Sequence, residues 1–186
     1  LARRVDRFSI TLGVEEGQPL EGTGARTAIL IPVANEEPER VFAGIQATYQ
    51  SLEATGQIRH FDFYILSDSN DPDRWVEEEM AWAETCRSLG AFNRIFYRRR
   101  RVNIKRKSGN IADFCRRWGK NYRYMIVFDA DSVMAANTLV RMVQTMERHP
   151  KVGILQTAPL AVNRETLVAR TQQFANHVYS SMFAAG

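Results

Sequence analysis

Cysteine is scarce in this chain of 186 residues, which contains two, Cys86 and Cys115, far apart in the sequence. Two isolated cysteines cannot build a disulfide framework or a zinc cluster, so a small disulfide-rich scaffold and a zinc finger are excluded. Both lie in helical patterns, and we interpret them as buried apolar side chains in a reducing compartment. The three histidines, His60, His149 and His177, are scattered and are interpreted as structural.

Long apolar runs are also missing. No stretch approaches the roughly 18–20 apolar residues that span a bilayer, and no signal peptide opens the chain. The chain does not begin with Met and its last segment still has a helical pattern, so we expect a piece of a longer protein. The Gly-x-Ser-x-Gly motif of serine hydrolases and the P-loop motif are absent, so neither activity is supported.

The composition is otherwise that of an ordinary globular domain, with 45% hydrophobic and 25% charged residues. The formal net charge is only +4, but basic residues gather in the segment 98–107, "RRRRVNIKRK", which we name the basic run. Such a cluster attracts anions, whether nucleic acid, phosphate or lipid headgroups. The alternative for its individual arginines is a solvent-exposed face.

Strand-like and helical patterns alternate from residue 26 onward. Apolar runs typical of strands buried on both faces occupy residues 26–33, 61–69, 94–99, 124–130 and 152–159. Helical patterns follow at residues 34–56, 71–90, 108–120, 137–150 and 164–183. This repetition predicts an α/β fold, a mostly parallel sheet with helices on both faces. Residues 1–25 are interpreted as a lead-in segment, with one strand-like run at 8–14.

Polar and charged residues follow four of these strands. In an open parallel sheet the carboxyl ends of the strands meet at one edge, where ligands bind. That edge would receive Asn35 and Glu36, Asp68, the basic run, and Asp129 with Asp131. Folding alone does not require this repeated arrangement, so we expect a binding site there.

The segment "FDADS" places Asp129 and Asp131 where an apolar strand ends. If the extended chain continues, residues two apart face one side, about 6–7 Å apart at Cα. Two carboxylates suit Mg²⁺ or Mn²⁺, which bridge substrate phosphates. The alternative is turn and helix-cap chemistry. Because a basic run is expected nearby, we favour a metal site for a diphosphate.

Other positions are candidates for the same ligand. Lys107 would add positive charge, and the segment 108–110, interpreted as a helix start, would offer N–H groups to an anion. Asp68 could accept hydrogen bonds from a base or a ribose. The alternative for Asp68 is a cap on the helix that begins near Asp71.

Together these motifs resemble the nucleotide-sugar-binding half of a family 2 glycosyltransferase of the GT-A type. The matching segments are "ILIPVANEE", "YILSDS", "KRKSGNIADF" and "VFDADS". The resemblance implies a Rossmann-like donor-binding domain over residues 26–186. It also implies the donor contacts Ala34, Glu36, Asp68, Lys107, Asn110 and Asp129, with Asp129 and Asp131 on Mg²⁺ or Mn²⁺.

Longer runs, including "HFDFYILSDS", "IFYRRRR" and "KRKSGNIADFCRRWG", are similar to the bacterial inner-membrane glucosyltransferases that make osmoregulated periplasmic glucans. This similarity implies a cytoplasmic domain of a membrane-embedded inverting enzyme. It further implies UDP-glucose as donor, a growing glucan as acceptor, a β-1,2-linked backbone as product, and no nucleic-acid partner.

Later motifs of the family, an acidic catalytic base and Gln-x-x-Arg-Trp, are not identifiable. The segment "FCRRW" mimics the second, but it begins with Phe114 and precedes the two aspartates. We therefore expect the base beyond Gly186, with Glu165 as the first alternative. The acceptor half and the membrane helices are then absent, and we expect the chain to be inactive alone.

Two other functions remain open. A sugar-phosphate nucleotidyltransferase would share the sheet, the carboxylates and the basic loop, although "PVANEEPER" stands where its Gly-rich loop would be. A non-enzymatic RNA-binding module would use the run Arg98–Lys107, although only Phe96 and Tyr97 offer aromatic rings beside it.

Overall fold

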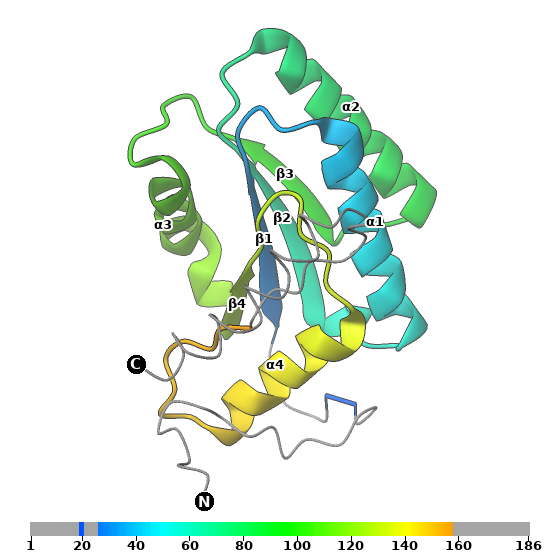
Figure 1. The fold of residues 1–186 in the computed structure, drawn as a ribbon, viewed down its shortest axis with the longest axis vertical. Helices are drawn as coiled ribbons and strands as arrows, with labels where there is room; N and C mark the ends of the chain where they lie inside the picture. Colours follow the sequence, from blue (N-terminus) through cyan, green and yellow to red (C-terminus); the bar gives the residue numbers. More distant parts are fainter. Residues whose placement is uncertain (1–18, 21–25, 158–186) are drawn as a thin grey trace, which may run out of the picture. The chain divides into compact units, whose positions relative to one another are not determined.

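The computed structural model describes residues 19–20 and 26–157. Its helices and strands are, in chain order, β1 (Thr27–Val33), α1 (Pro38–Ala54), β2 (Phe61–Ser67), α2 (Pro72–Leu89), β3 (Ile95–Arg99), α3 (Arg106–Trp118), β4 (Tyr124–Val127) and α4 (Ala136–Arg148). Short 3-10 turns at Ile58–His60 and Gly119–Asn121 lead into β2 and β4. The predicted alternation of strand and helix is confirmed as far as α4 (Figure 1).

The four strands form one parallel sheet in the order β3-β2-β1-β4. The central strand β1 pairs along its whole length with β2, from Thr27 opposite Phe61 to Val33 opposite Ser67. On its other side β1 pairs with β4, from Thr27 opposite Tyr124 to Leu30 opposite Val127. Because every pair is parallel, the carboxyl ends of all four strands lie at one edge.

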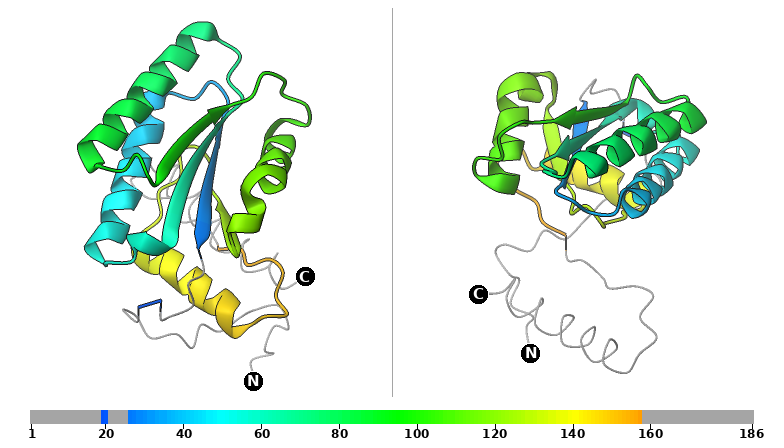
Figure 2. Two further views of the ribbon diagram at one scale, coloured as in Figure 1. Left: turned by 180° about the vertical axis from the view of Figure 1, so that it is seen from behind. Right: turned by 90° about the horizontal axis from the view of Figure 1, so that it is seen from above.

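Helices cover both faces of this sheet, as predicted (Figure 2). Every residue of β1 is buried, which explains its unbroken apolar sequence. Ile29 and Ile31 belong to a large cluster with residues of α1, α2 and α4. Ala28 and Leu30 point the other way and pack in a smaller cluster with Phe114 of α3. The period of two along β1 thus divides the core between the two faces.

Local signals place the helix ends. Pro38 and Pro72 occupy the first positions of α1 and α2, where a missing N–H has no cost. Asp71 caps α2, because its carboxylate accepts a hydrogen bond from the N–H of Asp73 at 3.0 Å. The alternative interpretation of Asp68 as this cap is therefore wrong.

The fifth strand, predicted at residues 152–159, is not formed where the structure describes it. Residues 152–157 have no regular structure, and none of the described strands pairs with them. Ile154 is 88% exposed, so this apolar segment lacks the burial that favours a strand. The predicted helix at 164–183, the strand-like run at 8–14 and Glu165 lie outside the described residues.

Residues 15–144 form one compact unit, which contains all four described strands. The remaining residues form a second unit. Within the described ranges, no helix is both long enough and apolar enough to cross a membrane. The division into a lead-in at 1–25 and a donor-binding part at 26–186 stays a prediction.

Candidate functional site

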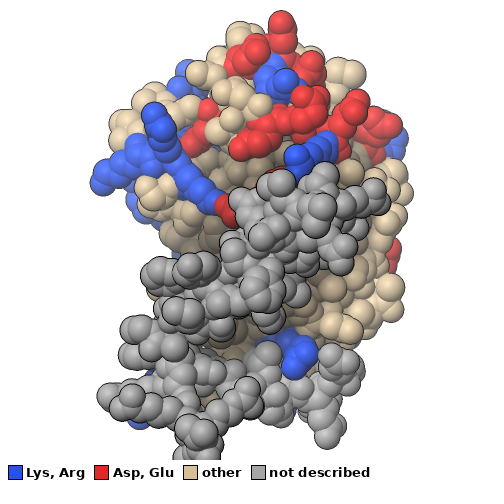
Figure 3. Space-filling model, viewed as in Figure 1, with Lys and Arg blue, Asp and Glu red and all other residues tan. Residues whose placement is uncertain are grey.

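A cleft of about 790 Å³ lies at the carboxyl ends of β1, β2 and β4. The β1–α1 loop, the end of β2, the start of α3 and the loop after β4 form its walls. Its charged lining residues are Glu36, Glu37, Asp68, Asp129, Asp131, Arg40, Arg106 and Lys107. Figure 3 shows Lys and Arg side chains projecting on the side of α3, and Asp and Glu gathered over the ends of α1 and α2. The predicted position of the site at this edge of the sheet agrees with this cleft.

Asp129 and Asp131 lie in a turn rather than in a strand. β4 ends at Val127, and the N–H of Ser132 donates to the carbonyl of Asp129 at 3.0 Å. The expectation that an extended chain aligns the two carboxylates is therefore wrong. Both residues nevertheless line the cleft, with side chains 74% and 60% exposed respectively.

Each of these two carboxylates has a cationic partner from another element. Lys107, from α3, forms an ion pair with Asp129. Arg40, from α1, lies 3.3 Å from Asp131, measured between guanidinium nitrogen and carboxylate oxygen. The helices α1 and α3 cover opposite faces of the sheet. The turn after β4 is therefore connected to both sides of the cleft by ion pairs.

The donor set of this cleft fits a divalent ion that is shared with a ligand. Carboxylate oxygens of Asp129 and Asp131 are the hard ligands that Mg²⁺ and Mn²⁺ prefer. No group of three His, Cys, Asp or Glu in the described part of the chain could hold a metal. The remaining ligands would have to come from phosphate oxygens and water, which is how Mg²⁺ is usually bound.

Asp68 directly follows β2, and its side chain is only 7% exposed. The guanidinium of Arg100 binds both of its carboxylate oxygens, with Nη2 at 2.7 Å from Oδ2 and Nε on Oδ1. These hydrogen bonds raise the pKa of Arg100. A carboxylate offers about four lone-pair sites, so Asp68 keeps acceptor capacity toward the cleft that it lines.

The β1–α1 loop is held to the β2–α2 loop by a set of hydrogen bonds. Asn35 has a left-handed backbone with a φ of 70°, and its N–H donates to Ser69 Oγ at 2.8 Å. The side chains of Asn35 and Asn70 meet at 2.9 Å. Glu36 accepts a hydrogen bond from the N–H of Ala34. The structure therefore brings Ala34 and Glu36 together in the lining of the cleft.

Behind these loops lies a carboxylate that the sequence analysis missed. Glu78, from α2, is 2% exposed and accepts three hydrogen bonds from hydroxyl groups. Its donors are Ser67 at 2.6 Å, Ser69 at 2.5 Å and Tyr97 at 2.8 Å. Burial raises the pKa of Tyr97, and the bond to Glu78 adds to this. Ser69 donates to Glu78 and accepts from the N–H of Asn35, so Glu78 helps to position Asn35 in the lining of the cleft.

The start of α3 has an unusual backbone. Lys105 and Arg106 are adjacent and left-handed, with φ of 60° and 44°, a conformation that costs roughly 1–2 kcal/mol per residue. The helix begins at Arg106, so Lys107 lies within its first turn and not before it. A Cβ on Gly109 would lie 2.0 Å from the carbonyl oxygen of Ile104, so only glycine permits this close approach.

Asn110 does not line the cleft, in contrast to its predicted role as a donor contact. Its side chain is fully buried, and Nδ2 donates to the carbonyl of Leu66 at 2.8 Å. Its Oδ1 accepts from Arg98, which also pairs with Asp113 at 2.8 Å. The amide of Asn110 thus joins α3 to β2 and β3. The segment 108–110 is also not the helix start, because α3 begins at Arg106 and the N–H of Gly109 already donates to the carbonyl of Lys105 at 3.1 Å.

The basic run is not a uniform surface. Arg98 and Arg100 are paired internally, with side chains 14% and 12% exposed. Arg99 points to the other side and lies over the ring of Trp75, 3.8 Å from its centroid. The alternative of a solvent-exposed face is therefore wrong for Arg98 and Arg100. An RNA-binding surface made of the whole run is not available, because two of its arginines have carboxylate partners.

Comparisons with known proteins agree with this geometry. Residues 28–184 match the model of the family described as glycosyl transferase family 2. The chain is 57% identical over 186 residues to glucans biosynthesis glucosyltransferase H of Ralstonia nicotianae, covering all of this chain and 22% of that protein. It is 55% identical over 181 residues to the protein of the same name in Dickeya dadantii, covering 97% of this chain and 21% of that protein. The chain therefore spans about a fifth of the length of these curated relatives.

Proposed function

Because this chain belongs to glycosyl transferase family 2, we propose that it is the donor-binding part of an inverting glucosyltransferase that uses UDP-glucose. The name of the relatives, glucans biosynthesis glucosyltransferase H, supports a glucan as the product. We extend the proposal to the β-1,2-linked backbone of osmoregulated periplasmic glucans. The domain would then face the cytoplasm as part of an inner-membrane protein, with the growing glucan as acceptor.

The cleft at the strand ends carries this proposal. Asp68, held at the base of the cleft, would accept a hydrogen bond from the uracil base or the ribose. Ala34 and Glu36, in the β1–α1 loop beside it, would contact the uridine part. Lys107, on the opposite wall, would bind phosphate oxygens in place of the carboxylate of Asp129. The residues proposed to contact the nucleoside thus lie on β1 and β2 and their loops, and the residue proposed to contact the diphosphate lies on α3.

Asp129 and Asp131 are the residues that would hold Mg²⁺ or Mn²⁺. When bound, the ion offsets the negative charge that develops on the UDP leaving group. Lys107 adds a charge-assisted hydrogen bond to the same phosphates, and Arg40 is near enough to Asp131 to do likewise.

Each acidic residue that lines the cleft has a hydrogen-bond or ion-pair partner in the described part of the chain. The five acidic residues that line it and their partners are Glu36 with the N–H of Ala34, Glu37 with Arg74, Asp68 with Arg100, Asp129 with Lys107, and Asp131 with Arg40. An inverting transfer needs a base for the acceptor hydroxyl. Its position beyond Gly186, and the inactivity of the chain alone, stay predictions.

Titration calorimetry with UDP-glucose tests the proposal directly. We expect binding with Mn²⁺ or Mg²⁺ and little binding in EDTA, and weaker binding by Asp131→Asn. ADP-glucose is the control for the base, and a single-stranded RNA is the control for the RNA-binding alternative. Formation of UDP-glucose from UTP and glucose 1-phosphate would instead support the nucleotidyltransferase. Equal affinity for UDP-glucose and ADP-glucose would contradict a uridine site.

A further inference from the structure

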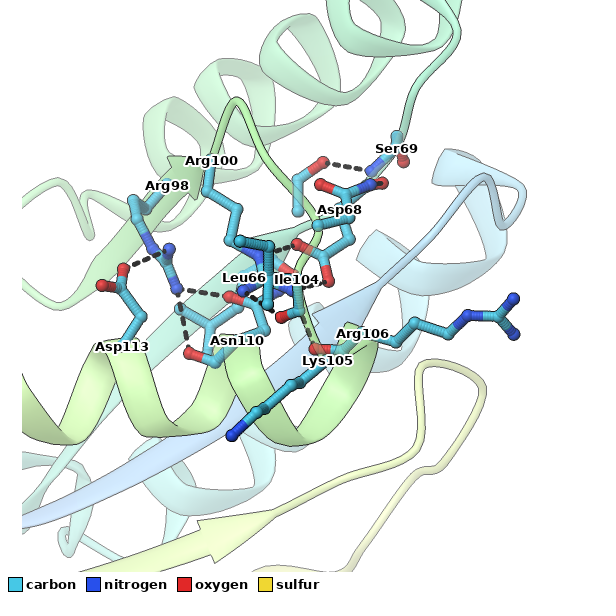
Figure 4. Close-up of polar contacts among 12 residues, drawn as sticks. Leu66, Asp68, Ser69, Arg98, Arg100, Ile104, Lys105, Arg106, Asn110 and Asp113 are labelled. Atoms are coloured by element: carbon cyan, nitrogen blue, oxygen red, sulfur yellow. Dashed lines mark hydrogen bonds and ion pairs between the residues drawn. The ribbon is translucent and has the colours of Figure 1, made fainter.

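One guanidinium ties Asp68 to the loop that precedes α3. Besides both oxygens of Asp68, Arg100 binds two backbone carbonyls, those of Ile104 at 3.1 Å and Arg106 at 2.8 Å. Asn103 completes the connection, because its side-chain amide donates to the carbonyl of Asp68. Figure 4 shows Arg100 and Asp68 facing one another, whereas the side chain of Arg106 points away. We name residues 100–106 with this guanidinium the clamp loop.

The clamp loop contains two adjacent residues with strained backbones. Lys105 and Arg106 are both left-handed without being glycine, a conformation that persists only where the surroundings impose it. Arg100 binds the carbonyls of Ile104 and Arg106, the two residues that flank Lys105. The guanidinium therefore stabilises the conformation that places Arg106 and Lys107 in the lining of the cleft.

We propose that Arg100 is a positioning residue for the donor: it makes the carboxylate of Asp68 and the strained turn at Lys105–Arg106 one rigid unit. This inference rests on the proposed function, in which Asp68 contacts the uridine part and Lys107 the diphosphate. Asp68 and Lys107 would contact different parts of the ligand. The distance between these two side chains depends on how the clamp loop is held against β2. Arg100 fixes this spacing without touching the donor.

Arg98 provides a matched comparison for this role. It lies in β3, two residues before Arg100, and is about equally buried, with 14% of its side chain exposed against 12% for Arg100. Its partners are Asp113 and Asn110, in the body of α3, and neither lines the cleft. If Arg100 had a purely structural role, substitutions of the two arginines would have the same effect on the affinity for UDP.

The test compares Arg100→Lys with Arg98→Lys in the same chain. Lysine keeps the charge but cannot form the fork of bonds that guanidinium makes. We expect both variants to lower the melting temperature by similar amounts. Only Arg100→Lys should weaken UDP binding in Mn²⁺, by about tenfold or more. Hydrogen exchange of the amides of residues 101–107 should also become faster in Arg100→Lys and not in Arg98→Lys.

The outcomes separate this inference from the proposed function. If Arg100→Lys binds UDP with unchanged affinity, or if both variants lose the same affinity, Arg100 is not a positioning residue. If the unchanged chain binds no UDP, the proposed function fails. The hydrogen-exchange comparison needs no ligand, so unchanged exchange in Arg100→Lys would overturn the clamp even then, and faster exchange would support it.

Discussion

Lys107 and Asp129 form an ion pair across the cleft between the first turn of α3 and the turn after β4, 22 residues apart in the sequence. Arg40 and Asp131 form a second pair, from the opposite face of the sheet. Both carboxylates that would bind a metal thus already have cations beside them. A metal ion must compete with these side chains, and a diphosphate would attract the same side chains toward itself.

We therefore expect Mn²⁺ to bind the chain weakly alone and tightly with UDP. Asp129 and Asp131 would supply two ligands, and phosphate oxygens would complete the coordination while they neutralise Lys107. Calorimetric titration of Mn²⁺ with and without UDP measures the difference. Lys107→Gln should improve the binding of Mn²⁺ alone and weaken the binding of UDP. Tight binding of Mn²⁺ without nucleotide would contradict this expectation.

Asn110→Ala should destabilise the fold and leave UDP affinity near that of the unchanged chain. The substitution removes a donor from the buried carbonyl of Leu66 and an acceptor from Arg98. Leaving such groups unpaired costs about 1–3 kcal/mol each. Urea unfolding measures the loss of stability, and Ser108→Ala, at an exposed position of the same helix, is the control. Lost affinity with unchanged stability would restore Asn110 as a ligand contact.

Glu78→Ala should cost at least about 2 kcal/mol of unfolding free energy, because three buried hydroxyl donors lose their acceptor. We also expect weaker UDP binding, since Ser69 links Glu78 to the N–H of Asn35. Glu78→Gln keeps one acceptor oxygen, so its stability and its affinity for UDP should lie between those of Glu78→Ala and those of the unchanged chain. Exposed Glu79→Ala is the control on the same helix, and an equal effect there would count against a role for Glu78.

The alternation of strands and helices, and the edge at which the candidate site residues gather, could be predicted from the sequence for a physical reason. Strands of a parallel sheet that are buried on both faces are apolar throughout, as β1 is, so they stand out against amphipathic helices. Their carboxyl ends share one edge, so residues such as Asp68 and Asp129 could be placed at the same cleft without knowledge of any contact.

The contacts within the site could not be predicted in the same way. Four identical arginines at 98–101 carry no signal for which of them is paired, because the pleat of β3 and the position of Asp68 and Asp113 decide it. Glu78 has the residue type of a solvated helix face, and only the hydroxyls around it show that it is buried. The end of β4 at Val127 depends on pairing with Leu30, which lies far away in the sequence.

The two cysteines should respond differently to a thiol reagent. Cys86 is fully buried, as predicted, and its thiol donates to the carbonyl of Ile95 at 3.6 Å. Cys115 is exposed, so the interpretation of this second cysteine as buried is wrong. We expect one thiol per folded chain to react rapidly with a disulfide reagent, and both to react in urea. Cys115→Ala should abolish the rapid reaction. Rapid reaction of Cys86 in the folded Cys115→Ala variant would show that solvent reaches Cys86 and would contradict its burial.

Alkaline pH should destabilise the fold through the same buried thiol. Burial raises the pKa of Cys86 from 9.0 to about 11. A raised pKa means that the folded chain holds this proton more tightly than the unfolded chain. Its contribution to stability is therefore complete below about pH 9 and is lost as the pH rises through about 11. Urea unfolding from about pH 8 to about pH 11 should show a falling free energy of unfolding.

Cys86→Ala provides the decisive comparison for this pH dependence. The variant is less stable at neutral pH, because it loses buried volume, but its stability should fall less steeply with pH. Cys115→Ala, which removes an exposed thiol, should keep the original slope. Burial also raises the pKa of Tyr97 and Tyr122, so some alkaline loss should remain in every variant. If Cys86→Ala and the unchanged chain lose stability in parallel, the thiol of Cys86 does not contribute to the alkaline loss of stability.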